Sequence, residues 1–147
     1  MQPFIIAIAG PSGSGKSLFA ETLCQEVRRD APQLGVVLIK EDAYYRDQRH
    51  IPLKDREAVN YDHPDALEQD LLARHLQELS AGRAVDAPLY DYTVHSRRSE
   101  TVRIEPAAVI IVEGILLLTH AGLRNAFDIK FYMDTPLDIC LLRRMAR

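Results

Sequence analysis

The chain has 147 residues, of which 47% are hydrophobic and 27% are charged, and its net charge is −3. This size predicts one domain with a single core, and the composition excludes disordered, collagen-like and coiled-coil chains. The longest apolar run, residues 107–112, is too short for a membrane helix, which needs about 20 residues. The acidic balance gives no basic surface for nucleic acid, and the N-terminus lacks the basic start of a signal peptide.

Cysteine usage also favours a cytoplasmic protein. Cys24 and Cys140 lie far apart in apolar helical contexts and have no metal-ligand spacing. We therefore expect two buried thiols in a reducing compartment.

Three short apolar runs, residues 4–9, 36–39 and 109–112, predict strands that are buried on both faces, as in a parallel sheet. Residues 129–133 predict a fourth strand. Amphipathic segments predict helices over residues 18–29, over a segment that opens at His63 and ends at Gly82, and from Pro136 to the end of the chain. The polar segment 43–61 predicts a functional loop and residues 84–104 predict a β-hairpin. The alternation predicts an α/β fold, with a parallel sheet flanked by helices and a small hairpin excursion.

A complete phosphate-binding motif follows the first predicted strand. It is the segment Gly10-Pro11-Ser12-Gly13-Ser14-Gly15-Lys16-Ser17, which matches G-x-x-x-x-G-K-[ST]. Backbone N–H groups of such a turn, and the positive end of the helix that follows, face phosphate oxygens. Lys16 supplies a point charge to the outer phosphates, and the Ser17 hydroxyl is placed to reach Mg²⁺. The sequence therefore predicts a P-loop domain that binds a nucleoside triphosphate.

The rest of the chain favours a small-molecule kinase among the P-loop classes. No N-K-x-D guanine-reading motif is present, and residues 79–83 are a poor match to the signature loop of a transport ATPase. A motor or helicase would need a longer chain. Phosphoryl transfer needs only a few well-placed groups, and this suits a chain of this length.

Two carboxylates follow predicted strands. Asp42 lies just beyond residues 36–39, and Glu113 follows residues 109–112. The carboxyl ends of parallel strands meet at the crevice where such sheets bind ligands. Glu113 is expected to hold Mg²⁺ directly or through water, or else to cap the strand. Asp42 is expected to accept a proton from a substrate hydroxyl and to face the metal, or else to be a turn residue.

Five segments together resemble the uridine kinase (uridine–cytidine kinase) family. They are residues 10–17, 41–46, 61–66, 88–97 and 112–115. The D-H-P-D-A segment at 62–66 and the Y-D-Y-x-x-H-S-R segment at 90–97 are more specific than the phosphate loop. Phosphoribulokinase and pantothenate kinase share the loop and the layout, but we do not expect both segments in them.

The resemblance implies an activity and a set of site residues. The activity is transfer of the γ-phosphate of ATP or GTP to the 5′-hydroxyl of uridine or cytidine, with Mg²⁺, in pyrimidine salvage in the cytoplasm. The implied fold has a five-stranded sheet, and the implied assembly is a homotetramer. Asp42 would be the base, Asp62 would bind the ribose hydroxyls, Tyr90 and His95 would contact the pyrimidine, Tyr45 and Tyr92 would form aromatic walls, and Arg144 and Arg147 would reach the base and the phosphates.

Several alternatives stay open. The tyrosines could be core residues, and the two arginines could complement the dipole of their own helix. We expect one P-loop kinase domain over residues 1–147 that is incomplete at its C-terminus, with a lid that begins near residue 143, and therefore weak or no turnover. The competing functions are another small-molecule kinase, for example a phosphoribulokinase-like enzyme, and a nucleotide-binding fragment without turnover.

Overall fold

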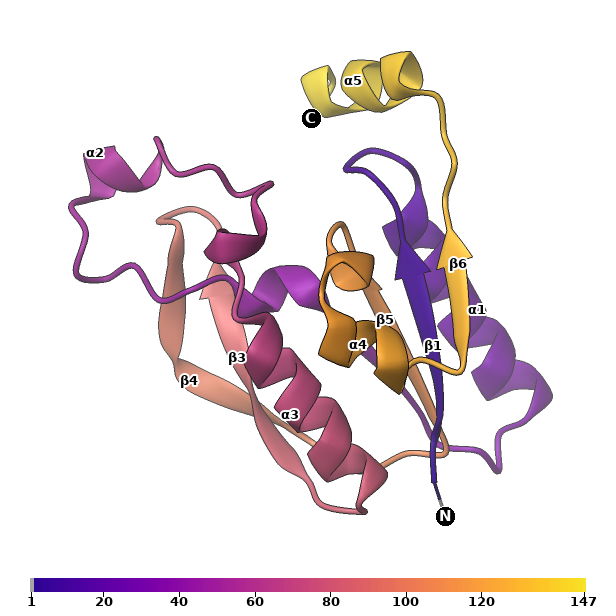
Figure 1. The fold of residues 1–147 in the computed structure, drawn as a ribbon. Helices are drawn as coiled ribbons and strands as arrows, with labels where there is room; N and C mark the ends of the chain where they lie inside the picture. The colour runs from indigo at the N-terminus through magenta and orange to yellow at the C-terminus, as the bar shows by residue number, and fades with distance from the viewer. Residues whose placement is uncertain (1) are drawn as a thin grey trace.

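A four-stranded parallel sheet forms the centre of the computed structural model, which describes residues 2–147. The strand order is β2 (Val36–Lys40), β5 (Val109–Gly114), β1 (Phe4–Ala9) and β6 (Ile129–Tyr132), as Figure 1 shows. The four predicted strands and the α/β class are confirmed. Strand β5 runs further than predicted and includes Glu113 and Gly114. The fifth strand that the resemblance implies is not found in the described part of the chain.

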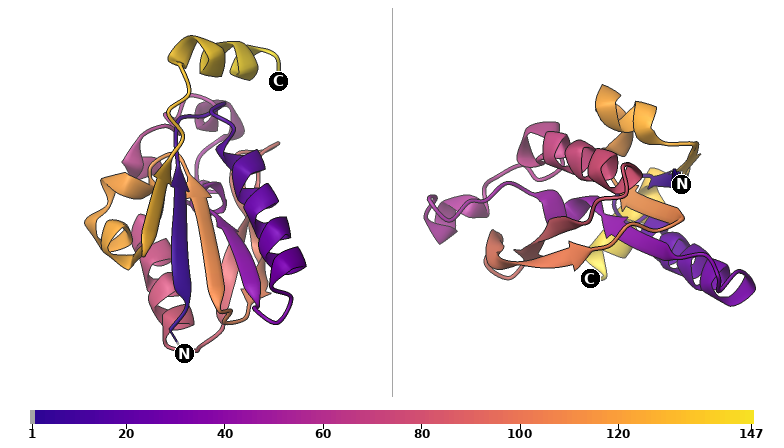
Figure 2. Two further views of the ribbon diagram at one scale, coloured as in Figure 1. Left: turned by 90° about the vertical axis from the view of Figure 1, so that its right-hand side faces the viewer. Right: turned by 90° about the horizontal axis from the view of Figure 1, so that it is seen from below.

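Helices cover both faces of the sheet (Figure 2). Side chains alternate along a strand, so successive residues of β1 face opposite layers. On one face, Ile6 and Ile8 pack with Ala20 and Cys24 of α1 (Lys16–Asp30). On the other face, the cluster that includes Ala7 and Val112 packs against α3 (Gln69–Ser80) and the short α4 (Ala121–Ala126). Both cysteines are free and buried, as predicted.

The helix predicted to open at His63 is wrong in its first part. The chain makes one 3-10 turn, η2 (Pro64–Ala66), whose Asp65 N–H is capped by His63 Nδ1 at 3.2 Å. Leu67 then adopts an extended conformation, with φ of −110° and ψ of 143°, and forms a β-bridge with Tyr45. Helix α3 begins only at Gln69. Leu67, which the prediction placed within the helix, therefore lies outside it and at the wall of a cavity.

A two-stranded antiparallel hairpin, β3 (Val85–Asp91) and β4 (Ser96–Ile104), lies beside the main sheet (Figure 1). The hairpin falls within the predicted range 84–104, and its register shifts between Pro88 and Tyr90. The hairpin packs against α3 and the 3-10 turn η1 (Glu41–Tyr44). The long polar segment after η1 is largely irregular, as predicted, but contains the one-turn helix α2 (Leu53–Arg56).

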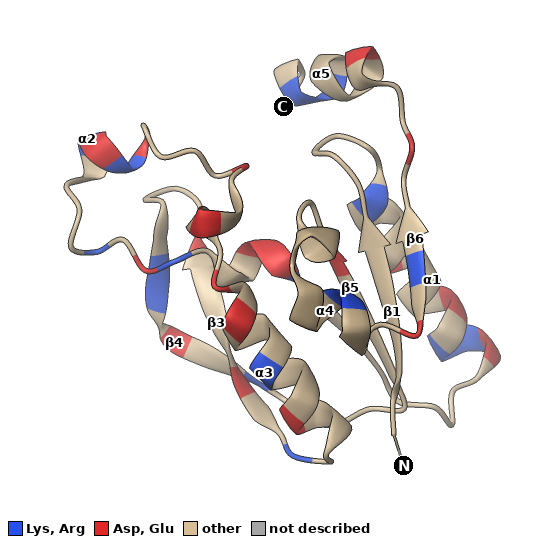
Figure 3. Ribbon diagram, viewed as in Figure 1, with Lys and Arg blue, Asp and Glu red and all other residues tan. Residues whose placement is uncertain are grey.

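The last helix, α5 (Leu137–Met145), lies over the phosphate loop (Figure 1) and ends before the final two residues, where the prediction continued it. Thr135 Oγ1 donates to the carbonyl of Ser14 at 2.8 Å, and Arg143 Nη1 donates to the carbonyl of Gly13 at 3.1 Å. Between β5 and α4 the chain makes one further 3-10 turn, η3 (Leu117–Thr119). Acidic and basic residues are interspersed over the elements (Figure 3). Among residues 2–147, no helix has the length and apolar character to cross a membrane.

Candidate active site

The phosphate loop connects the central strand β1 to α1, as the motif predicts. Its backbone enters the left-handed region at Gly13 (φ 81°) and Gly15 (φ 91°), a conformation that glycine adopts without steric cost. A Cβ atom at Gly13 would lie 2.7 Å from the carbonyl oxygen of Cys140 in α5. Lys16 is the first residue of α1 and is buried. The loop therefore presents its N–H groups and the start of a fifteen-residue helix to one point in space.

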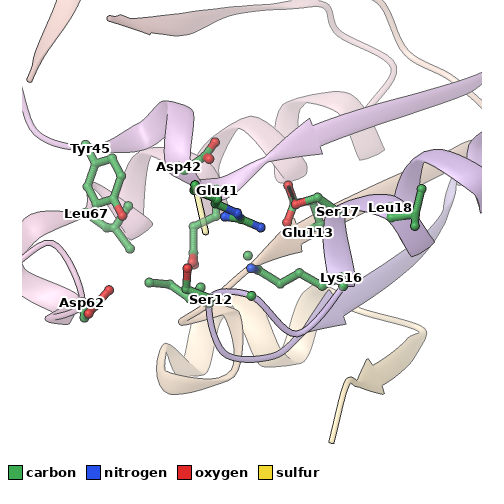
Figure 4. A pocket seen from close by; sticks show the side chains of 15 residues that line it. Ser12, Lys16, Ser17, Leu18, Glu41, Asp42, Tyr45, Asp62, Leu67 and Glu113 are labelled. Atoms are coloured by element: carbon green, nitrogen blue, oxygen red, sulfur yellow. Dashed lines mark hydrogen bonds between the residues drawn. The ribbon is translucent and has the colours of Figure 1, made fainter. Parts of the chain in front are cut away.

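A cavity of about 230 Å³ opens in front of this loop (Figure 4). It is bounded by the loop, by η1, by the end of β5 and by the segment around Asp62. Figure 4 shows Ser17 and Glu113 on one side of the cavity and Tyr45, Leu67 and Asp62 on the other. The predicted site residues that line it are Ser12, Gly13, Gly15, Lys16, Ser17, Asp42, Tyr45, Asp62, Glu113 and Arg147.

The two predicted metal-side carboxylates meet at the same edge of the sheet. Glu113 is buried and accepts a hydrogen bond from Ser17 Oγ at 3.1 Å. Burial raises the pKa of Glu113, the charge of Lys16 opposes that rise, and the negative charge of Asp42 adds to it. A hydroxyl and two carboxylates are oxygen ligands of the kind that Mg²⁺ takes together with water and phosphate. The residues therefore fit this ion, although the described residues contain no cluster of three or more His, Cys, Asp or Glu side chains.

Glu41 is a buried carboxylate that the sequence reasoning missed. Its side chain accepts hydrogen bonds from Leu116 N at 2.8 Å and from Gln69 Nε2 at 3.3 Å. Gln69 also donates to the carbonyl of Leu116 at 2.8 Å. Burial raises the pKa of Glu41 to about 7. Glu41 therefore ties η1, which carries Asp42, to the segment that follows β5.

Four predicted nucleoside contacts lie in one aromatic cluster beside the cavity. The ring of Tyr45 lies 5.4 Å from that of Tyr90, which lies 5.1 Å from that of Tyr92. Tyr61, which was not predicted as a contact, joins Tyr45 to His95. Its ring centroid lies 5.2 Å from that of Tyr45, and it stacks on the His95 ring with 5.4 Å between centroids. Burial and the charge of Asp42 raise the pKa of Tyr92. Of the four predicted contacts, Tyr45 lines the cavity itself, and the other three belong to the cluster beside it.

Arginines of α5 and of the residues after it approach the site from above. Arg144 Nη1 lies 3.8 Å from Asp62 Oδ2, and Arg147 lines the cavity. Arg143, which was not predicted, contacts the phosphate loop through the carbonyl of Gly13. The structure thus brings Arg147 to the cavity and Arg144 to Asp62 at its wall.

A phosphate loop after a central parallel strand, with carboxylates at the ends of neighbouring strands, defines a P-loop enzyme that uses a nucleoside triphosphate. The family model described as "Phosphoribulokinase / Uridine kinase family" matches residues 5–147, and the chain belongs to this family. The membership expected from the sequence is confirmed.

Curated relatives support the same assignment. The chain is 56% identical to a protein named "Uridine kinase" from Shewanella oneidensis, over 99% of this chain and 69% of the relative. It is 53% identical to a "Uridine kinase" from Erwinia tasmaniensis, over 99% of this chain and 68% of the relative.

Solved structures share the fold. A structure titled "Possible Uridine Kinase from Bacillus stearothermophilus" matches with a TM-score of 0.71 and 22% identity, over 97% of this chain and 77% of that one. Phosphoribulokinase from Rhodobacter spheroides matches with a TM-score of 0.67 and 18% identity, over 98% of this chain and 63% of that one.

Proposed function

We propose that this protein transfers the γ-phosphate of ATP or GTP to the 5′-hydroxyl of uridine or cytidine. One observation carries the proposal. A single cavity is lined by residues of the phosphate loop and by Asp42 and Asp62, so the donor phosphates and the candidate acceptor residues share one space. The relatives named uridine kinase, which match 99% of the chain, support the same activity.

On the donor side, the chain positions the phosphates and neutralises their charge. Loop N–H groups and the N-terminus of α1 hold the phosphates, and Lys16 places a positive charge at the outer ones. Ser17, Asp42 and Glu113 would hold Mg²⁺. When bound, this ion neutralises charge on the phosphate oxygens. Thr135, just before α5, and Arg143 of α5 donate hydrogen bonds to the carbonyls of Ser14 and Gly13 and thereby brace the backbone of the loop.

On the acceptor side, Asp42 is the candidate base. It lies in η1 at the edge of the cavity, where its carboxylate can orient a nucleoside hydroxyl and take its proton. Asp62 faces the same cavity, and a carboxylate can accept two hydrogen bonds from the cis-diol of a ribose. The aromatic cluster that begins at Tyr45 offers flat surfaces for a pyrimidine ring.

A panel of acceptors tests the proposal. We would measure ATP consumption and product formation with uridine, cytidine, ribulose 5-phosphate and pantothenate. UMP and CMP should form, and the other two acceptors should remain unphosphorylated. Product from ribulose 5-phosphate or pantothenate alone would overturn the acceptor assignment. Tight ATP binding without any product would instead favour a nucleotide-binding module.

A further inference from the structure

Arg56, at the end of α2, joins two segments that are far apart in the sequence. Its Nε donates to the carbonyl of Ile51 at 2.7 Å, and its Nη2 lies 3.2 Å from the carbonyl of Arg49. Its Nη1 donates to the carbonyl of Val94 at 2.9 Å. Val94 lies in the turn between β3 and β4, directly before His95. One guanidinium group therefore fixes the shape of the α2 segment and holds the tip of the hairpin against it.

Arg56 also holds the ring that covers His95. Its backbone carbonyl lies 2.8 Å from the hydroxyl of Tyr61, which also lies 3.1 Å from Oε1 of the buried Gln48. The Tyr61 ring stacks on the imidazole of His95, with 5.4 Å between centroids and 23° between planes. The position of the imidazole is thus set from two sides, through its backbone and through its ring face.

The backbone of His95 needs such support. Its φ is 47°, and no other non-glycine residue in the described range has a positive φ. A non-glycine residue keeps a left-handed backbone conformation only where its surroundings hold it, and such residues cluster at ligand sites. The turn itself adds a local bond from Thr93 N to Asp91 Oδ1 at 3.0 Å, and the tie from Arg56 anchors that turn to the rest of the domain.

We propose that Arg56 and Tyr61 are positioning residues that hold His95 where it contacts the pyrimidine and thereby set nucleoside affinity and the choice between uracil and cytosine. This inference rests on the proposed function. Uracil and cytosine differ at one ring edge in which groups donate and which accept hydrogen bonds, so an imidazole that reads that edge must be held firmly. Tyr61 directly precedes Asp62, and its carbonyl lies 3.2 Å from the Tyr45 hydroxyl. The same support therefore reaches the ribose end of the site.

The kinetic test compares Arg56→Ala and Tyr61→Phe with Arg98→Ala. Arg98 is an exposed arginine of the same hairpin and gives a matched charge control. Loss of the Arg56 contacts should raise the uridine KM by about 10-fold or more, leave the ATP KM within about twofold, and change the ratio of kcat/KM for uridine to that for cytidine. Tyr61→Phe keeps the stacked ring and loses the hydroxyl, so it should show a smaller change in the same direction. Arg98→Ala should resemble the parent.

A spectroscopic arm separates this inference from the proposed function. The NMR chemical shifts of the His95 ring protons in the nucleoside-free protein report the position of the imidazole relative to the Tyr61 ring. These shifts should change in Arg56→Ala and remain the same in Arg98→Ala. An unchanged uridine KM and unmoved His95 resonances would overturn the inference, and if Arg56→Ala does not fold, Tyr61→Phe decides by the same two criteria. If the parent phosphorylates neither pyrimidine nucleoside, the proposed function fails and the pyrimidine contact fails with it. The resonances then decide alone whether Arg56 positions His95.

Discussion

Replacing Glu41 by Gln should remove a pH-dependent cost of folding. Glu41 is 1% exposed, and its pKa is about 7 in the fold against an ordinary value of 4.5. Between these values the folded chain keeps a proton that the unfolded chain releases. The stability that this proton provides is complete below about pH 4.5 and is lost as the pH rises to about 7. At about 1.4 kcal/mol for each pH unit, the whole loss is about 3 kcal/mol, of which about 2 kcal/mol falls above about pH 5.5.

Glutamine reproduces the uncharged state of the carboxyl group at position 41 and keeps one acceptor for Leu116 N. Its amide nitrogen cannot accept the hydrogen bond from Gln69 Nε2, but this loss is the same at every pH. We would measure the free energy of unfolding in urea for the parent and for Glu41→Gln at about pH 5.5 and about pH 8. Between these two pH values, the difference in this free energy should change by about 2 kcal/mol in favour of the variant. Glu57→Gln, at an exposed position after α2, serves as the control and should follow the parent. A parent–variant difference that is equal at the two pH values would refute the reasoning.

Four further substitutions test the site. Lys16→Ala should weaken ATP binding about 10- to 100-fold in titration calorimetry, because a charge-assisted phosphate contact is lost. Asp42→Asn should lower kcat by about 10²- to 10⁴-fold and leave uridine affinity largely intact, and a near-normal kcat would contradict a role as base. Asp62→Ala should raise the uridine KM and narrow the preference for uridine over deoxyuridine. Equal rates on the two nucleosides in the parent would contradict the role of Asp62 in binding the ribose hydroxyls. Gly13→Ala places a Cβ 2.7 Å from the Cys140 carbonyl at a φ of 81°, so both Tm and ATP affinity should fall, and a variant with the parent's Tm would argue against that contact.

The parts of the fold that follow from local chemistry could be predicted. Short apolar runs located the inner strands β1 and β5 and their neighbour β2, because a strand covered on both faces needs apolar residues at every position. The edge strand β6 is exposed and contains Lys130, so its signal was weaker. The glycines of the phosphate loop and the strand before it located the nucleotide site. Asp42 and Glu113 could be placed at one edge of the sheet because parallel strands end there together.

The parts that depend on distant partners could not be predicted. Glu41 gave no signal, because a charged residue is rarely buried and its partners Gln69 and Leu116 lie 28 and 75 residues away. The helix predicted from His63 is broken because Leu67 forms a bridge with Tyr45, and this tertiary contact prevails over the helical spacing of the leucines. In the sequence, Arg56 looks like a surface residue of a loop, because nothing in the sequence indicates that its guanidinium group binds the carbonyls of Ile51 and Val94.

The close packing of Glu41 on Gly114 has a consequence for how this sequence can vary. A Cβ atom at position 114 would overlap the side chain of Glu41, so the two positions share one volume. Because the nearest overlapping atom is the Cβ of Glu41 itself, a larger residue at 114 is compatible with this backbone only if glycine stands at 41, and glycine would leave the N–H of Leu116 without its acceptor. Position 114 therefore cannot take a larger residue by a single substitution without loss. In an alignment of relatives, a residue larger than glycine at 114 should occur only where glycine stands at 41 and the turn that contains Leu116 has also changed.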